Sequence, residues 1–162
     1  MRDFLGPRAA SLSTPAKMLY SAFAALNLLG LASSAILYDD IVRFDARSTP
    51  AELYARLTAH YAATDGRRLV ETTHAHLFSM SVLLLVAGHL FLLTSASARA
   101  KLALIAVGTF AVFAHLAAPW IVRLGGGRGG SALAYPLTGA LLFLALGAMT
   151  CIPVWEMWRR GQ

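Results

Sequence analysis

Four long apolar stretches divide the chain, and polar segments separate them. Each stretch reaches the roughly 20 residues that an α-helix needs to cross the hydrocarbon core of a bilayer. The pattern therefore predicts an all-α integral membrane protein, built as an up-down-up-down four-helix bundle with mostly short loops. The expected membrane-spanning helices cover residues 18–38, 72–94, 102–122 and 131–154 of a single domain, 18–158.

The polar segments have different expected roles. Residues 1–17 contain two prolines and are expected to form a loosely ordered N-terminal arm, and the glycine-rich residues 125–130 are expected to be a flexible link. Residues 39–70 form the longest extramembrane loop. Within it, residues 48–52 are typical of a helix start, and we expect a short amphipathic helix that lies on the membrane surface or caps the bundle. Its apolar face is formed by Leu53, Leu57 and Tyr61.

Composition supports the membrane class. Hydrophobic residues make up 57% of the chain and charged residues 14%, whereas about 25% of an ordinary soluble domain is charged. The net charge of +6 does not indicate nucleic acid, because the basic residues flank the apolar stretches, where they set topology and contact lipid headgroups. Cys151 can form no internal disulfide because it is the only cysteine. We find no nucleophile, phosphate-loop or dinucleotide motif that would indicate an enzyme class.

The distribution of basic residues predicts the orientation in the membrane. Four spans place both termini on one side, and the fourteen Lys and Arg residues divide equally, seven to each side. On the side of the termini they lie closer to the span ends, and Arg99 and Lys101 occupy one very short loop. The positive-inside rule then predicts a multi-pass protein of the bacterial inner membrane with both termini in the cytoplasm.

Three histidines in the second span are the main functional clue. Residues 72–94 contain no Asp, Glu, Lys or Arg, yet they include His74, His76 and His89. Ionisable side chains within a span are costly, and they often mark a cofactor, an ion path or a proton path. At about 100° per residue, His74 and His89 lie within about 60° of one another, whereas His76 and His89 are about 140° apart. One face of the helix therefore cannot hold all three.

The third span contributes one further histidine. His115 lies roughly 10 Å below the outer end of its helix, so His76 and His115 are expected near one level in the membrane. Two imidazoles from facing helices are what a b-type haem requires, and a four-helix bundle is a usual place for one. His89 is expected closer to the cytoplasmic side, with Asn27 and Met149 as candidate neighbours.

Other interpretations of these histidines stay open. The third span offers only His115, so the pattern supports at most one bis-histidine haem. The histidines could instead line a quinone site, or His74, His76 and His115 could bind a transition metal at the outer surface, since imidazole suits copper, zinc and iron. A third interpretation is that they hydrogen-bond within the bundle and bind no cofactor. The spacing of the histidines does not choose among these.

Residues outside the histidine helix have simpler interpretations. Arg123 follows the end of the third span, where its side chain could reach lipid headgroups or hold a haem propionate. Glu156 and Arg159 are expected to form a surface pair. Asn27 is expected to hydrogen-bond a neighbouring helix, and the small residues between Gly30 and Ala35 would permit close contact with one.

Motifs in three of the spans resemble a known family. THAHLFSM and GHLFLLT in the second span, PWIVR at the end of the third and IPVWEMW near the C-terminus resemble small four-helix bacterial membrane proteins that often carry an elongation factor 1-alpha label. The resemblance covers Lys17 to Trp158 and implies four spans, but it supplies no activity. The family often has an acidic residue at the position of His115, so a haem bound there would be particular to this chain. Motif positions are matched by His74, His76, His89, Pro119, Trp120, Arg123 and Glu156.

Together these features favour a small electron-transfer or respiratory-complex subunit of the membrane, with His76, His115, His89, His74 and Arg123 as candidate cofactor-binding residues. Haem b is the expected cofactor, and a quinone or a transition metal are the alternatives. The expected partners are the lipid bilayer and either a larger membrane complex or further copies of the chain. Two other function classes are a cofactor-free structural or assembly subunit and an outward-facing metal-binding membrane protein.

Overall fold

The computed structural model describes residues 9–42, 47–125 and 133–159. The first eight residues of the predicted arm, and all but Gly125 of the predicted flexible link, lie outside the described residues. The described residues form helices and no strands, which confirms the all-α class. A short 3₁₀ helix, η1 (Ala9–Ser11), precedes five α-helices: α1 (Thr14–Val42), α2 (Pro50–Ala63), α3 (Gly66–Leu92), α4 (Ala98–Leu124) and α5 (Ala134–Trp158).

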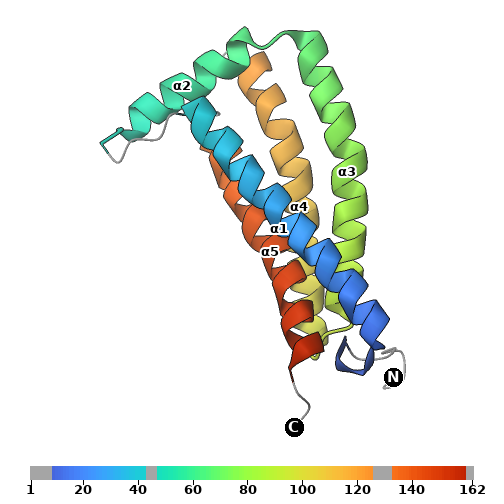
Figure 1. Ribbon diagram of the computed structural model, residues 1–162. Coiled ribbons are helices and arrows are strands. Elements are labelled where there is room, and N and C mark those ends of the chain that lie inside the picture. Colours follow the sequence, from blue (N-terminus) through green and yellow to red (C-terminus); the bar gives the residue numbers. More distant parts are fainter. Residues whose placement is uncertain (1–8, 43–46, 126–132, 160–162) are drawn as a thin grey trace.

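Four of these helices, α1, α3, α4 and α5, are long and apolar enough to cross a membrane. They run alternately up and down, so that both chain ends lie at the same end of the bundle (Figure 1). We call this the terminal end, which also contains the α3–α4 loop. Helix α2 lies across the opposite end, which we call the α2 end. The four-span membrane bundle predicted from the apolar stretches is confirmed.

The helices extend beyond the predicted spans. Helix α3 begins at Gly66 rather than near residue 72, and its first turns carry an exposed ion pair between Arg67 and Glu71, with 2.8 Å between Nε and Oε1. Helix α5 continues to Trp158 rather than ending near residue 154. An apolar stretch marks only the part of a helix that lies in hydrocarbon, because outside it a helix can carry charges that interact with water and headgroups.

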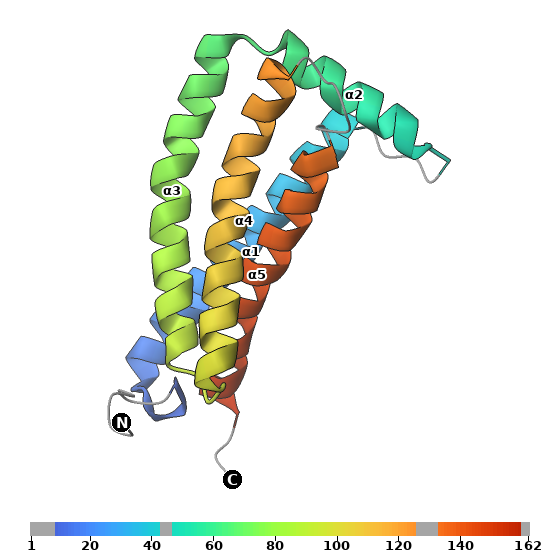
Figure 2. The same cartoon turned by 180° about the vertical axis from the view of Figure 1, so that it is seen from behind.

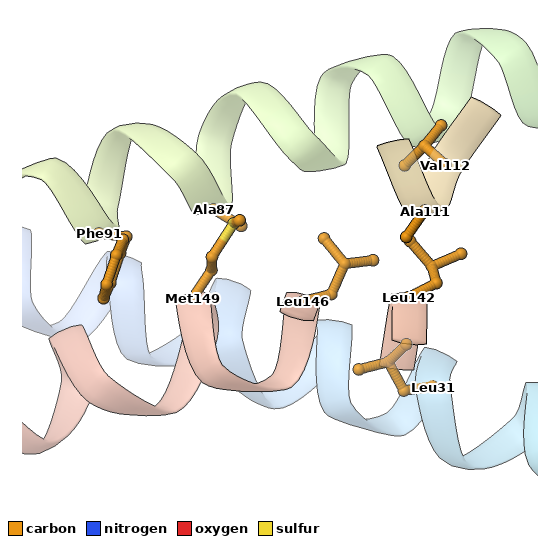
Figure 3. Packing of buried hydrophobic residues seen from close by; sticks show 8 residues of the cluster. All are labelled: Leu31, Ala87, Phe91, Ala111, Val112, Leu142, Leu146 and Met149. Atoms are coloured by element: carbon orange, nitrogen blue, oxygen red, sulfur yellow. The ribbon is translucent and has the colours of Figure 1, made fainter. Parts of the chain in front are cut away.

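Helix α5 is the centre of the bundle. It packs against α1, α3, α4 and η1, whereas α1 packs against α5 and α2 within the described part of the chain. In the view from behind, α5 and α4 lie side by side in front, and α1 lies behind them (Figure 2). The main apolar cluster accordingly draws on four helices (Figure 3), with Leu31 of α1, Ala87 and Phe91 of α3, Ala111 and Val112 of α4, and Leu142, Leu146 and Met149 of α5.

The start of the described chain is docked on the terminal end, which corrects the expectation of a loosely ordered arm for residues 9–17. Ala9 is fully buried among Leu90 and Met157, and its backbone N–H donates to the carbonyl of Leu93 at 2.9 Å. The nearby Lys101 is also buried and donates from Nζ to the carbonyl of Leu92 at 2.8 Å. A lysine at this position satisfies a carbonyl that the end of helix α3 leaves without a helical partner.

Glu156 links the C-terminal helix to the α3–α4 loop. The expected surface pair with Arg159 is not what the structure shows. The two carboxylate oxygens of Glu156 instead accept hydrogen bonds from the backbone N–H and the hydroxyl of Ser95, both at 2.7 Å. Arg159 lies over the ring of Trp155, at 4.4 Å from its centroid. A carboxylate that accepts two hydrogen bonds in the loop ties the ends of three helices together.

Helix α2 caps the bundle, one of the two arrangements predicted for it. Its N-terminus is a capping box, in which Thr49 and Glu52 each accept from the backbone of the other. Leu57 and Tyr61 are buried against Val122 of α4, so the predicted apolar face of the helix points into the bundle.

Helix α1 uses only part of its apolar surface. Asn27 is buried and donates from Nδ2 to Thr150 of α5 at 2.6 Å, which confirms the expected contact with a neighbouring helix. The small residues between Gly30 and Ala35 do not make the close contact expected of them. Apart from the buried Leu31 they are exposed, and a Cβ added at Gly30 would meet nothing within 4 Å.

Candidate functional site

His115 is held inside the α2 end by contacts with α5. Its ring is half-buried and stacks on Tyr135, with the centroids 4.5 Å apart. Its Nδ1 lies 3.2 Å from the hydroxyl of Thr138, which itself donates to the carbonyl of Ala134. Because that hydroxyl proton is already used, the oxygen accepts and Nδ1 of His115 is the donor. Gly139 leaves the room for the ring, since an added Cβ would lie 3.2 Å from Cε1.

His76 lies on α3, which packs against α4, the helix of His115. His76 is half-buried, and its Nδ1 lies 2.8 Å from the carbonyl of Thr72. A carbonyl only accepts, so Nδ1 of His76 carries the proton. Both histidines therefore use Nδ1 as a donor and leave Nε2 as the atom that could bind a metal or accept a hydrogen bond, an arrangement common among histidine ligands.

A tyrosine cluster closes the interior above His115, and we did not predict it from the sequence. Tyr135 of α5 lies at its centre, with Tyr61 of α2 at 5.0 Å and Tyr38 of α1 at 6.0 Å between ring centroids. Burial raises the pKa of Tyr61, and its interaction and hydrogen bond with Tyr135 raise it further. The available signal was the position of Tyr38 and Tyr135 at span ends, which is equally typical of an interfacial aromatic belt.

His74 lies apart from the other two predicted metal ligands. It is exposed, and its ring contacts Phe78 on the same helix at 5.0 Å. Within the described residues, no group of three His, Cys, Asp or Glu side chains could hold a metal ion. His76 and His115 are half-buried on two helices that pack together, whereas His74 is exposed, because residues two positions apart in a helix point in nearly opposite directions.

His89 lines an apolar groove between α3 and α4. The groove has a volume of about 420 Å³ and runs from Leu77, toward the α2 end, to His89 and Leu92 at the terminal end. The hydroxyls of Ser81 and Thr109 also line it, but they donate to carbonyls four residues earlier in their own helices. His89 is thus the polar group of the groove that can still bind a ligand.

The two residues expected beside His89 contact other groups instead. Asn27 is paired with Thr150, and Met149 is fully buried in the main apolar cluster. His89 is exposed because it lies on the outer face of α3, beside the buried positions Ala87 and Leu90. In a bilayer this exposed side chain faces the lipid close to the end of its helix.

Arg123 contacts the protein backbone. Its guanidinium donates from Nη1 to the carbonyl of Thr64, the residue that ends α2. The same side chain lies against Gly66, where an added Cβ would be 3.5 Å from Nη2. Trp120, one turn earlier in α4, donates from its indole N–H to the hydroxyl of Thr73 at 2.9 Å. These residues fasten the α2–α3 corner to α4, a role that we did not predict for Arg123.

The fold and these sites define a small multi-pass helical membrane protein with half-buried histidines on α3 and α4 toward the α2 end and an exposed histidine in an apolar groove toward the terminal end. The chain belongs to a family described as a transmembrane helical domain, whose model matches residues 61–162. The match begins at Tyr61 and includes all of α3, α4 and α5. Neither the curated proteins nor the solved structures give a significant match to the chain.

Proposed function

We propose that the protein is a small quinone-binding subunit of a membrane electron-transfer system, with His89 as the residue that hydrogen-bonds the quinone. The observation that supports this most strongly is the apolar groove between α3 and α4, in which the imidazole of His89 keeps its hydrogen-bonding capacity. A quinone matches such a site, because it combines a flat apolar ring and a long apolar tail with two carbonyl acceptors.

The energetics of an exposed imidazole support a ligand at this position. A polar side chain that faces hydrocarbon costs free energy unless it finds a partner, and within membranes such residues are usually functional. His89 lies three residues before the end of α3, so a ring bound there would lie near the membrane surface. The twelve residues from His89 back to Leu77 correspond to about 18 Å of helix, along which an apolar tail could lie.

The test is a binding titration of the purified full-length protein in mild detergent, with decyl-ubiquinone as the ligand. We expect saturable binding that His89→Leu weakens about tenfold, the loss of one hydrogen bond from an apolar site. His74→Leu is the matched control, because His74 is an exposed histidine of the same helix outside the groove. Equal binding by both variants would refute a quinone site at His89.

A b-type haem held by His76 and His115 is the second candidate. It is supported by the half-buried imidazoles of His76 and His115 on two helices that pack together, since each uses Nδ1 as a donor and leaves Nε2 for an iron. Such a haem would supply one-electron transfer inside the bundle. An absorption spectrum of protein from cells supplied with haem precursor tests this. A sharp reduced α-band that is lost in His115→Ala would support it, whereas a colourless folded protein would refute it.

We also propose that the terminal end faces the cytoplasm of a bacterial inner membrane. Arg99, Lys101 and Arg159 support this orientation, since these basic residues lie at or next to helix ends on that side. A green fluorescent protein fused to the C-terminus should fluoresce, because it does not mature after export in an unfolded state. A dark fusion, together with an active exported alkaline phosphatase fusion at the same position, would reverse the orientation.

The third proposal concerns assembly. The protein would act within a larger membrane complex or as a homo-oligomer, and the exposed small residues between Gly30 and Ala35 of α1 support this because they allow close helix contact. Native mass spectrometry of the gently solubilised protein, expressed in its own host, would show the assembly. A monomer without quinone or haem would refute both the redox function and the assembly.

A further inference from the structure

A second groove meets the first at His89. It has a volume of about 370 Å³ and lies between α1 and α3, where it is lined by Tyr20 of α1 and by His89, Leu85, Val86 and Leu90 of α3. At the groove Tyr20 of α1 lies in the same apolar cluster as Leu90 and Val86 of α3, although α1 makes its main helix contacts with α5 and α2. His89 lines both grooves, so one ligand could contact Tyr20 and His89 and extend between α3 and α4.

Both polar groups at this junction are available to a ligand. Among the described residues, neither the Tyr20 hydroxyl nor the His89 imidazole has a hydrogen-bond partner. The residues that line the two grooves include no Asp, Glu, Lys or Arg. The junction therefore suits an uncharged, largely apolar molecule with a hydrogen-bonding atom at each of two opposite edges, and it does not suit a phosphate or a carboxylate.

We infer that this junction binds the ring of a para-quinone, with the N–H of His89 donating to one ring oxygen and the hydroxyl of Tyr20 donating to the opposite one. This inference rests on the proposed quinone-binding function and adds the location of the ring, the second hydrogen-bonding residue and the para arrangement of the two oxygens. The tail then follows the groove between α3 and α4 away from His89.

The same two side chains suit the reduced ligand. A neutral imidazole both donates and accepts, and so does a phenol hydroxyl, so each can receive the O–H of a quinol as readily as it donates to a quinone oxygen. The junction therefore binds the quinone and the quinol with comparable affinity. A ligand that carried only one ring oxygen would leave either Tyr20 or His89 without its partner and would bind more weakly.

Isotope-edited infrared spectroscopy can observe each hydrogen bond separately. The full-length protein in lipid nanodiscs is loaded with decyl-ubiquinone that carries carbon-13 at one or the other ring carbonyl. Both carbonyl bands should move to lower wavenumber than in lipid alone. Tyr20→Phe should return one labelled band to its free position and His89→Leu the other, and each variant should weaken binding about tenfold. His89→Gln, which keeps an N–H donor, should retain the shifted band.

Matched controls and the possible outcomes make the test decisive. Tyr54→Phe and His74→Leu remove the same groups outside the two grooves and should change neither the bands nor the affinity. If Tyr20→Phe has no effect while His89→Leu weakens binding, this inference is wrong and the proposed function stands. If the quinone binds but neither variant matters, the grooves hold only its tail, and both proposals fail. Absence of binding to the unaltered protein would also overturn both.

Discussion

Replacement of Gly139 by alanine should destabilise the bundle, although alanine is the better helix former. A Cβ at this position would lie 3.2 Å from Cε1 of His115, which is closer than ordinary van der Waals contact, and 3.5 Å from its Nδ1, which is an ordinary contact. The imidazole has little room to retreat. Tyr135 stacks against it at 4.5 Å, and its Nδ1 is bound to the hydroxyl of Thr138 at 3.2 Å. The ring must therefore shift and strain or lose that hydrogen bond.

The magnitude follows from three opposing effects. Overpacking a well-filled interior costs about 1–3 kcal/mol, and a lost hydrogen bond costs about 1 kcal/mol. Against these costs, replacing glycine by alanine within a helix stabilises the helix by up to about 1 kcal/mol. We expect Gly139→Ala to lower the free energy of unfolding by about 1–3 kcal/mol. Gly147→Ala in the same helix has nothing within 4 Å of its added Cβ, so it should be neutral or slightly stabilising.

The two variants are compared by reversible unfolding in a mild detergent titrated with dodecyl sulfate, followed by helical circular dichroism. The steric origin of the effect is tested by placing Gly139→Ala in a His115→Ala background. There the methyl group has space, and the penalty should disappear, since residues in contact do not contribute additively. If Gly139→Ala proves as stable as Gly147→Ala, the described packing of His115 against α5 is wrong.

Three further predictions are tested by the same unfolding titration or by hydrogen exchange. Glu156→Ala should lower the free energy of unfolding by about 1 kcal/mol, because it removes two hydrogen bonds to Ser95, whose exposed donors water can still reach; an unchanged midpoint would contradict that link. Arg123→Gln should release α2 from the Thr64 carbonyl, which would show as faster hydrogen exchange in α2 while the rest of the bundle keeps its protection. Folding raises the pKa of Tyr61, so its neutral hydroxyl stabilises the fold. This stabilisation is complete below about pH 10 and is lost as the pH rises toward the pKa of the folded state. The unfolding midpoint of Tyr61→Phe should therefore fall less in alkali than that of the unaltered protein.

Local sequence signals predicted the elements well. The apolar stretches identified the four long helices, because each is uninterrupted over the thickness of a bilayer. The Ser-Thr-Pro-Ala-Glu segment predicted the start of α2, since Thr49 and Glu52 can satisfy one another's backbone donors without help from the rest of the fold. Asn27 was expected to bond a neighbouring helix because an amide has few other partners in hydrocarbon.

Partners that depend on the tertiary arrangement could not be predicted in this way. Glu156 has a nearby arginine in the sequence, but its actual partner, Ser95, is sixty-one residues away and is brought to it by the packing of α5 against the α3–α4 loop. Arg123 similarly lies far in sequence from the Thr64 carbonyl that it binds. Long side chains at helix ends can reach several groups, and only the fold decides which one is close.

The histidines of α3 show most clearly where sequence reasoning stops. Helical periodicity separated His76 from His89 and placed His74 near the face of His89, and in the structure His74 and His89 are exposed whereas His76 is half-buried. Periodicity could not say which of these faces points inward. In a soluble helix the more apolar face is the buried one, but lipid is as apolar as a protein interior, so both faces of α3 have similar side chains. Which histidines are buried depends on residues in other helices. Gly139 of α5 leaves room for the ring of His115, and α1, which packs mainly on α5 and α2, leaves His89 exposed.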